Sequence, residues 1–289
     1  MPDLEGRIAV VTGGNIGLGF KSALELARKG AQVVIGCRTV SKGEAAEERI
    51  RSEVPEAQLE TLQLDLVDSA SIEAFALAFS ARHGQLHILM NNAGVVNLEA
   101  LERTPGGHEM QMATNHYGHF ALTGRLYQTL ISTDQARVVT LSSAGHRLGE
   151  IRFDDLDWRK RAYVRDKAYG DSKLANLMFT VRLQQKFAEE SVAAISVAAH
   201  PGLTGTERQQ SIGIGGALAR KLASSVEMGC LSQLMAATSS DVRGGQFIGP
   251  RFTLRGYPAD VTRKLAELDQ KVIDRLWRVT EEITGVTYS

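Results

Sequence analysis

The sequence has only two cysteines, Cys37 and Cys230, among its 289 residues, too few for a disulfide framework. It has no excess of either charge, because 33 Lys and Arg residues balance 33 Asp and Glu residues. Neither nucleic acid nor an anionic membrane is therefore favoured as a partner. No apolar run approaches the roughly 20 residues that span a bilayer, and the polar opening MPDLEG is unlike a signal peptide. These absences predict a cytoplasmic protein without a membrane anchor.

Short β-branched runs alternate with longer helical patterns from the first residues onward. Seven such runs predict strands, at Arg7–Val11, Gln32–Gly36, Leu59–Leu64, Leu86–Met90, Arg137–Leu141, Ala194–Ala198 and Gly245–Ile248. This alternation predicts an α/β protein with a Rossmann fold, a doubly wound parallel sheet of about seven strands with helices on both faces. Because the chain shows no linker and no internal repeat, residues 1–289 are expected to form a single domain.

Two irregular connections, residues 144–167 and 203–228, interrupt this rhythm after predicted strands. Ligands of open α/β sheets bind outside the carboxyl ends of the strands, so these connections are expected to form the substrate pocket. The second connection spaces apolar residues among glycines, and its few charges nearly cancel. This composition predicts a lipophilic substrate. The alternative, that the apolar residues only pack a surface helix, stays open.

A glycine-rich turn follows the first predicted strand and precedes a predicted helix. Its spacing is G-x-x-x-G-x-G, preceded by a threonine. Glycines permit a tight turn and a close approach of the backbone to a pyrophosphate, whose charge the helix N-terminus stabilises. In isolation such a turn is a weak signal, but its place after the first strand favours a dinucleotide. The expected contacts are Thr12, Gly13, Asn15, Ile16, Gly17 and Gly19.

The second predicted strand is followed by Arg38, and no carboxylate stands there to bind a ribose 2′-hydroxyl. An arginine in this place accommodates a 2′-phosphate, so NADP(H) is the predicted cofactor. The alternative is a solvated loop arginine. Asp65 and Leu66, which end the third strand, are expected beside the adenine. Asn92-Ala93-Gly94 ends the fourth strand with small residues where the sheet meets the cofactor.

The candidate catalytic residues follow the fifth predicted strand, which ends in Ser142-Ser143. Tyr169 and Lys173 are expected to open a long helix and to share one face of it, since they are four residues apart. A nearby ammonium group is expected to lower the pKa of the phenol toward neutrality, which suits it for acid–base chemistry. A second Tyr-x-x-x-Lys, Tyr163 to Lys167, lies in the irregular connection and is interpreted as incidental.

In this order and spacing, the motifs resemble those of the short-chain dehydrogenase/reductase family over nearly the whole chain. The resemblance adds Asn115 and the segment Pro201-Gly202…Thr206. It implies an NADP(H)-dependent oxidoreductase that interconverts a carbonyl group, in a ketone or aldehyde, and an alcohol. It also implies further cofactor contacts from Pro201, Gly202, Thr204 and Thr206.

The resemblance implies one role for each catalytic candidate. Tyr169 is the acid and base that protonates the substrate oxygen during reduction, and Ser143, favoured over Ser142 by the family pattern, hydrogen-bonds that oxygen. Lys173 also holds the nicotinamide ribose, while Asn115 keeps a water in a proton relay. No tetrahedral set of His, Cys, Asp or Glu accompanies these residues, so no metal is predicted.

The long interval from Ser143 to Tyr169 resembles the branch with retinol dehydrogenases and light-dependent protochlorophyllide reductases. Retinol dehydrogenases commonly carry an anchor before the first strand, which here starts at about Arg7. The pattern typical of protochlorophyllide reductases has a cysteine where this chain has Leu203. Neither retinol nor protochlorophyllide is therefore assigned as the substrate. The alternatives are a non-catalytic NADP(H)-binding sensor or scaffold and a protochlorophyllide reductase-like double-bond reductase. A small-molecule substrate is expected, and a homo-oligomer stays open.

Overall fold

The computed structural model describes residues 1–96, 98–202, 225–265 and 268–288. Its described strands form one sheet in the order β3-β2-β1-β4-β5-β6-β7-β8. Strands β1 to β7 are parallel, and β8 pairs antiparallel with β7. The strands are β1 Ile8–Thr12, β2 Gln32–Cys37, β3 Leu59–Gln63, β4 Ile88–Asn91, β5 Arg137–Leu141, β6 Ile195–Ala199, β7 Phe247–Pro250 and β8 Pro258–Asp260. The predicted α/β fold with about seven parallel strands is confirmed.

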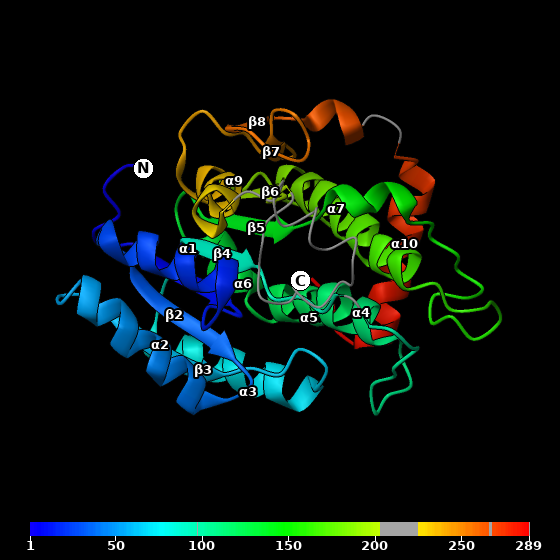
Figure 1. Cartoon of the computed structure of the whole chain (residues 1–289), viewed down its shortest axis with the longest axis horizontal. Helices are drawn as coiled ribbons and strands as arrows, with labels where there is room; N and C mark the ends of the chain where they lie inside the picture. The colour runs from blue at the N-terminus through cyan, green and yellow to red at the C-terminus, as the bar shows by residue number, and fades with distance from the viewer. Residues whose placement is uncertain (97, 203–224, 266–267, 289) are drawn as a thin grey trace.

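Helices cover both faces of the sheet (Figure 1). They are α1 Gly17–Arg28, α2 Val40–Glu53, α3 Ser69–Arg82, α4 Met110–Met112, α5 Gly118–Arg125, α6 Tyr127–Ser132, α7 Arg165–Glu189, α9 Val226–Thr238 and α10 Gln270–Thr284. One buried apolar cluster joins Val10 of β1 to α3, α5, α7 and α10. A second joins Ala9 and Val11 of β1 to α1, α2 and α9. Because both faces are buried, the strand is a continuous apolar run rather than an alternating one.

The direction of the chain across the sheet reverses between β1 and β4. From β1 the strands proceed outward to β3, and the chain then returns to place β4 on the other side of β1. The loops after β1 and β4 consequently diverge, and such a switch point is where open α/β sheets bind ligands. Thr12 and Asn91 end these two strands.

Two helical segments differ from their predicted form. The sequence pattern around residues 107–130 predicts one long helix, but the structure breaks it into α4, a π-helical turn at Ala113–Tyr117, α5 and α6. Gly118 follows the π-helical turn and packs so closely on the backbone of Leu66 that a Cβ there would collide with it. Helix α7 begins at Arg165, so Tyr169 lies in its second turn rather than at its opening.

Strand β8 was not predicted, because three residues are too few to show a periodic pattern. Over the described part of the chain, no helix combines the length and apolar character needed to cross a bilayer.

Candidate active site

A cleft of about 340 Å³ lies at the switch point, beyond the carboxyl ends of β1, β4 and β5. Its lining includes the predicted site residues Gly13, Asn15, Ile16, Gly17, Gly19, Arg38, Asn92, Ala93, Gly94, Tyr169, Lys173 and Pro201. Another hollow, of about 460 Å³, lies beside Asp3, Lys29 and Glu56 and contains none of the predicted residues. The cleft at the switch point is therefore the candidate active site.

The glycine turn has the backbone that the sequence pattern requires. Gly13 and Gly17 have φ angles of +65° and +57°, in the left-handed region that favours glycine. A Cβ on Gly19 would collide with the carbonyl of Gly13 and the side chain of Asn92. At the start of α1, Ile16 offers no side-chain cap to the first N–H groups. Uncapped N–H groups at a helix N-terminus fit an anion such as a pyrophosphate.

Exposed cations mark the end of the cleft near β2. Arg38 and Lys42 line it together with Thr39, and no Asp or Glu is among the described lining residues. Lys42, which the sequence reasoning missed, lies in the first turn of α2. Its signal in the sequence is that it is a second basic residue, four positions after Arg38. Two cations without a competing carboxylate fit a phosphate group better than a ribose hydroxyl.

Thr12 is buried beneath the cleft and ties the loop after β4 to the end of β1. Its Oγ1 accepts hydrogen bonds from the backbone N–H groups of Asn92 and Ala93, both at 2.9 Å. The Asn92 amide donates in turn to the Thr12 carbonyl at 2.8 Å. These bonds fix two walls of the cleft relative to each other.

The Ser143 side chain lies beside the Tyr169 phenol. Ser143 Oγ accepts from the N–H of Gly145 at 3.1 Å, which leaves its own proton to donate. Burial raises the pKa of the Tyr169 phenol, and the neighbouring Ser143 hydroxyl opposes that rise. The expected net lowering of this pKa is therefore wrong for the structure. Its physical reason is that burial outweighs the opposing effect of Ser143, while the Nζ of Lys173 stands 5.7 Å from the ring centroid.

Lys173 is a buried cation with a backbone partner. Its Nζ donates to the carbonyl of Leu141 at 3.0 Å. Burial lowers the pKa of this ammonium group from 10.5 to about 8, because a charge is costly away from water. Ser142, the alternative serine, donates its hydroxyl to the Lys173 carbonyl at 2.8 Å, and this bond engages its proton away from the cleft.

Because the charge of Lys173 is costly, Lys173→Met is expected to stabilise the cofactor-free protein. The lowered pKa corresponds to about 3 kcal/mol in the free energy of unfolding. The folded-state pKa of Lys173 lies below the unfolded value. The charged lysine therefore destabilises the folded protein fully below pH 8, and this destabilisation disappears as the pH rises toward 10.5. Urea unfolding should show a large gain at pH 7 and a small one at pH 10. Lys167→Met, at an exposed position of α7, is the control, and an equal gain at both pH values would contradict the interpretation.

Asn115 lies in the π-helical turn and does not line the cleft. Its amide binds Val95 twice, accepting from the N–H at 2.7 Å and donating to the carbonyl at 3.0 Å. The same amide nitrogen donates to Ser172 Oγ at 2.9 Å. Asn115 therefore joins the loop after β4 to the helix that carries Tyr169 and Lys173.

Several predicted residues lie elsewhere. Asp65 caps the turn after β3, where its Oδ1 accepts from the N–H of Val67 at 3.1 Å. Leu66 is buried in the apolar core. Gly202, with a φ of +74°, packs on the backbone of Leu254. None of these three lines the cleft. Thr204 and Thr206, with most of the 203–228 connection, lie outside the described residues.

The second Tyr-x-x-x-Lys motif lies apart from the cleft. Tyr163 accepts a hydrogen bond from Gln111 at 2.8 Å, and burial raises the pKa of its phenol to about 12. Lys167 is exposed. Tyr163 thus contacts other protein groups rather than the lining of the site.

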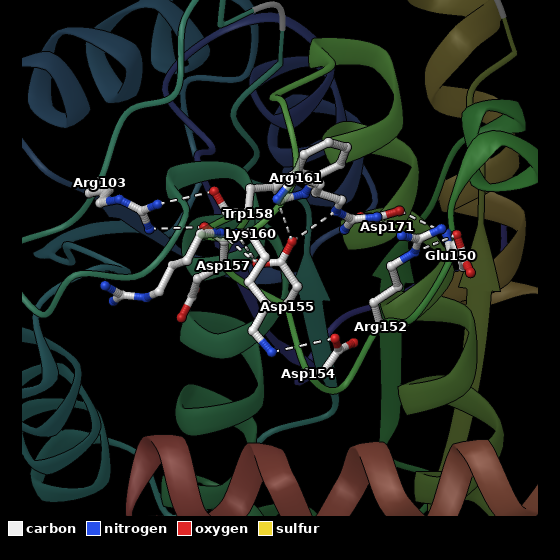
Figure 2. Close-up of polar contacts among 11 residues, drawn as sticks. Arg103, Glu150, Arg152, Asp154, Asp155, Asp157, Trp158, Lys160, Arg161 and Asp171 are labelled. Carbon is white, nitrogen blue, oxygen red and sulfur yellow. Dashed lines mark hydrogen bonds and ion pairs between the residues drawn. The ribbon is translucent and has the colours of Figure 1, made fainter.

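A partly buried arginine attaches the 144–167 connection to α7 (Figure 2). Arg161 contacts Asp171 of α7 at 2.7 Å and Asp155 at 3.4 Å, and its guanidinium lies 3.6 Å from the centroid of the Trp158 ring. Asp171 also accepts from the N–H of Glu150 at 2.7 Å. We call Arg161, Asp155, Asp171 and Trp158 the connection cluster. This cluster attaches the connection to α7 at Asp171, two residues from Tyr169.

A dinucleotide turn and a Tyr-Lys pair in one cleft, with Ser143 beside the tyrosine, define an oxidoreductase, and comparisons with known proteins agree. The family model described as short chain dehydrogenase matches residues 7–215. Retinol dehydrogenase 12 of Mus musculus is 39% identical over 99% of this chain and 88% of its own length. The human protein of that name is 45% identical over 71% of this chain and 63% of its own length.

Solved structures show the same similarity. An uncharacterised protein from Mycobacterium paratuberculosis has a TM-score of 0.84 and 37% identity, covering 100% of this chain and 97% of that one. The Pseudomonas aeruginosa RhlG complex with NADP has a TM-score of 0.69 and 25% identity, covering 86% of this chain and 95% of that one. The chain belongs to the short-chain dehydrogenase/reductase family, in the branch that contains the retinol dehydrogenases. It is an oxidoreductase of alcohol or carbonyl substrates with a nicotinamide cofactor.

Proposed function

We propose that this enzyme uses NADP(H) to interconvert a ketone or aldehyde and an alcohol on a lipophilic small molecule, with Tyr169 as the acid and base. The observation that carries the proposal is the convergence of two groups in one cleft. The glycine turn with Arg38 and Lys42 forms one end of the cleft, and Tyr169 and Lys173 form the other.

The chain's own residues supply the acid–base part of this reaction. A bound nicotinamide supplies or accepts the hydride. Tyr169 is protonated at neutral pH because burial raises its pKa, so the phenol can give its proton to the substrate oxygen during reduction. The Ser143 hydroxyl, which lies beside this phenol, orients the same oxygen. Lys173 places a positive charge near the ring and favours the tyrosinate that remains.

The lipophilic substrate is proposed from the apolar part of the cleft and from the relatives. Val95, Val96, Leu18 and Leu141 line the cleft beside the polar groups. Relatives with up to 46% identity are named for retinol, a lipophilic alcohol. The cleft lining described here carries no carboxylate and offers its cations mainly at the cofactor end, which supports an uncharged substrate.

The preference for NADPH is expected to depend on Arg38. A charge-assisted hydrogen bond contributes about 1.5–3 kcal/mol, roughly ten- to a hundredfold in affinity. Arg38→Ala is therefore expected to reduce the ratio of kcat/KM for NADPH over NADH by about that factor, while turnover at saturating cofactor changes little. Arg51→Ala is the control, because Arg51 lies farther along the chain in α2 and is bonded to Glu47. Comparable kcat/KM values for both cofactors in the wild type would contradict the preference.

The proposed function is tested by the loss of NADPH absorbance with retinal, an aliphatic aldehyde, benzaldehyde and cyclohexanone as substrates. Turnover of an aldehyde or ketone that is abolished by Tyr169→Phe supports it. Tight NADPH binding without turnover of any carbonyl compound or alcohol would favour the sensor or scaffold instead. Reduction of a carbon–carbon double bond alone would favour the double-bond reductase.

A further inference from the structure

A buried histidine lies between the two halves of the candidate site. His119, in α5, is only 1% exposed and does not line the cleft. Its Nε2 is 2.9 Å from Thr12 Oγ1, and its Nδ1 is 3.0 Å from the backbone carbonyl oxygen of Asn115. The first partner ends β1 before the glycine turn, and the second lies in the π-helical turn.

The partners determine which ring nitrogen of His119 carries the proton. The carbonyl of Asn115 can only accept, so Nδ1 must be the donor. Burial, together with a smaller effect of the charge of Lys173, lowers the pKa of His119 to about 3, so the ring is neutral. In a neutral ring with Nδ1 protonated, Nε2 is an acceptor. The Thr12 hydroxyl therefore donates to Nε2 at 2.9 Å, in preference to the Met90 carbonyl at 3.3 Å, while its lone pairs accept from Asn92 and Ala93.

Each partner of His119 controls a different part of the site. Thr12 holds the backbone of Asn92 and Ala93, which line the cleft beside the glycine turn. Asn115 holds Val95 and, through Ser172, the helix next to Lys173. The two hydrogen bonds of His119 join these parts into one buried network.

We propose that His119 is a positioning residue that aligns the cofactor-binding turn with the catalytic helix through Thr12 and Asn115. It touches neither substrate nor cofactor, and it acts as a fixed donor toward one half and a fixed acceptor toward the other. A buried group that loses its partner is left unsatisfied, so each bond has a separable consequence. Loss of the Thr12 bond should loosen the cofactor wall. Loss of the Asn115 bond should disturb the Tyr169 and Lys173 geometry.

Two conservative variants separate the bonds, because asparagine places its amide nitrogen where histidine has Nδ1 and glutamine places its amide oxygen where histidine has Nε2. His119→Asn keeps the donor to Asn115 and loses the acceptor for Thr12. We expect its Kd for NADPH to rise about tenfold with a near-normal kcat. His119→Gln keeps the acceptor, so we expect a near-normal Kd and a kcat lower by about tenfold. His119→Phe should show both changes.

His87→Phe is the matched control. His87 is also a buried histidine, and its Nδ1 accepts from the N–H of Ile8 at 3.0 Å. This bond lies at the start of β1 and β4, at the opposite end of these strands from Thr12. The control should lower the Tm without changing Kd or kcat. If His119→Phe changes neither value more than His87→Phe does, the positioning role is overturned. Parallel changes in Kd and kcat in both amide variants would also overturn it.

The kcat measurement rests on the proposed function, whereas the Kd measurement needs only NADPH and a fluorescence titration. A wild type that binds NADPH without turnover contradicts the proposed function, and the Kd values still test His119. If no His119 variant folds, Thr12→Val removes the hydroxyl and is expected to raise the Kd about tenfold. Imidazole ¹⁵N shifts of the wild type should show Nδ1 protonated. A protonated Nε2 with a bare Nδ1 would overturn the assignment.

Discussion

Tyr169→Phe is expected to lower kcat by about 10² to 10⁴, the usual contribution of a general acid or base. The variant keeps the ring that lies near Lys173 and loses only the hydroxyl beside Ser143. The ring alone lines the cleft equally well, so the Kd for NADPH should stay close to the wild-type value. Steady-state turnover and a fluorescence titration measure the two quantities separately.

Tyr163→Phe is the control for this change, since it removes the phenol of the other Tyr-x-x-x-Lys motif. Tyr163 contacts Gln111 and Glu109 outside the cleft. Its loss should cost some stability and leave kcat nearly unchanged. If Tyr163→Phe were the damaging variant and Tyr169→Phe were active, the choice between the two motifs would be wrong.

Arg161→Met is expected to lower the free energy of unfolding by about 3–5 kcal/mol, because removing one partner leaves a buried charge uncompensated. Asp155 and Asp171 have side chains only 4% and 3% exposed. Burial raises the pKa of Asp171 to about 6 even with Arg161 present, so the carboxylate already bears a cost of desolvation. Urea unfolding of both proteins at one pH gives the difference.

The loss in free energy of unfolding caused by Arg161→Met should be larger at high pH than at low pH. The pKa of Asp171 in the folded state lies above its ordinary value of 3.8, so a charged Asp171 costs most above pH 6. Without Arg161 this cost grows, and Arg161→Met should therefore be less damaging at pH 5 than at pH 8. Lys160→Met is the control, because the Lys160–Asp154 pair is exposed (Figure 2) and exposed pairs contribute about 0–1 kcal/mol. Equal losses in the two variants would contradict the role of the cluster.

Much of the fold was predictable because its signals are local. A strand buried on both faces leaves an apolar run such as Arg7–Val11, and a turn that needs left-handed φ angles leaves glycines such as Gly13 and Gly17. The spacing of Tyr169 and Lys173 on one helix is also written in the sequence. The sequence shows such features because the backbone itself requires the residue type.

What the sequence did not show depends on contacts between distant segments. The π-helical turn displaces Asn115 from an ideal helix, and no residue pattern marks it. The pairing of His119 with Thr12 joins residues 107 positions apart. The pKa of Tyr169 is raised rather than lowered because the phenol is buried, which the motif alone does not reveal. In the sequence Arg161 is one basic residue in a polar stretch, and its contacts with Asp155 and Asp171 are visible only in the folded structure.

The reversal of strand order between β1 and β4 has a consequence for how such an enzyme can evolve and be redesigned. Arg38 and Lys42 belong to the β2 side of the sheet, whereas Ser143, Tyr169 and Lys173 belong to the β5 side. Within the sheet, the two sides pair only along β1 and β4. Mutations that alter the choice of cofactor can therefore accumulate on the β2 side without disturbing proton transfer on the β5 side. In the same way, mutations that admit new substrates can leave cofactor binding intact.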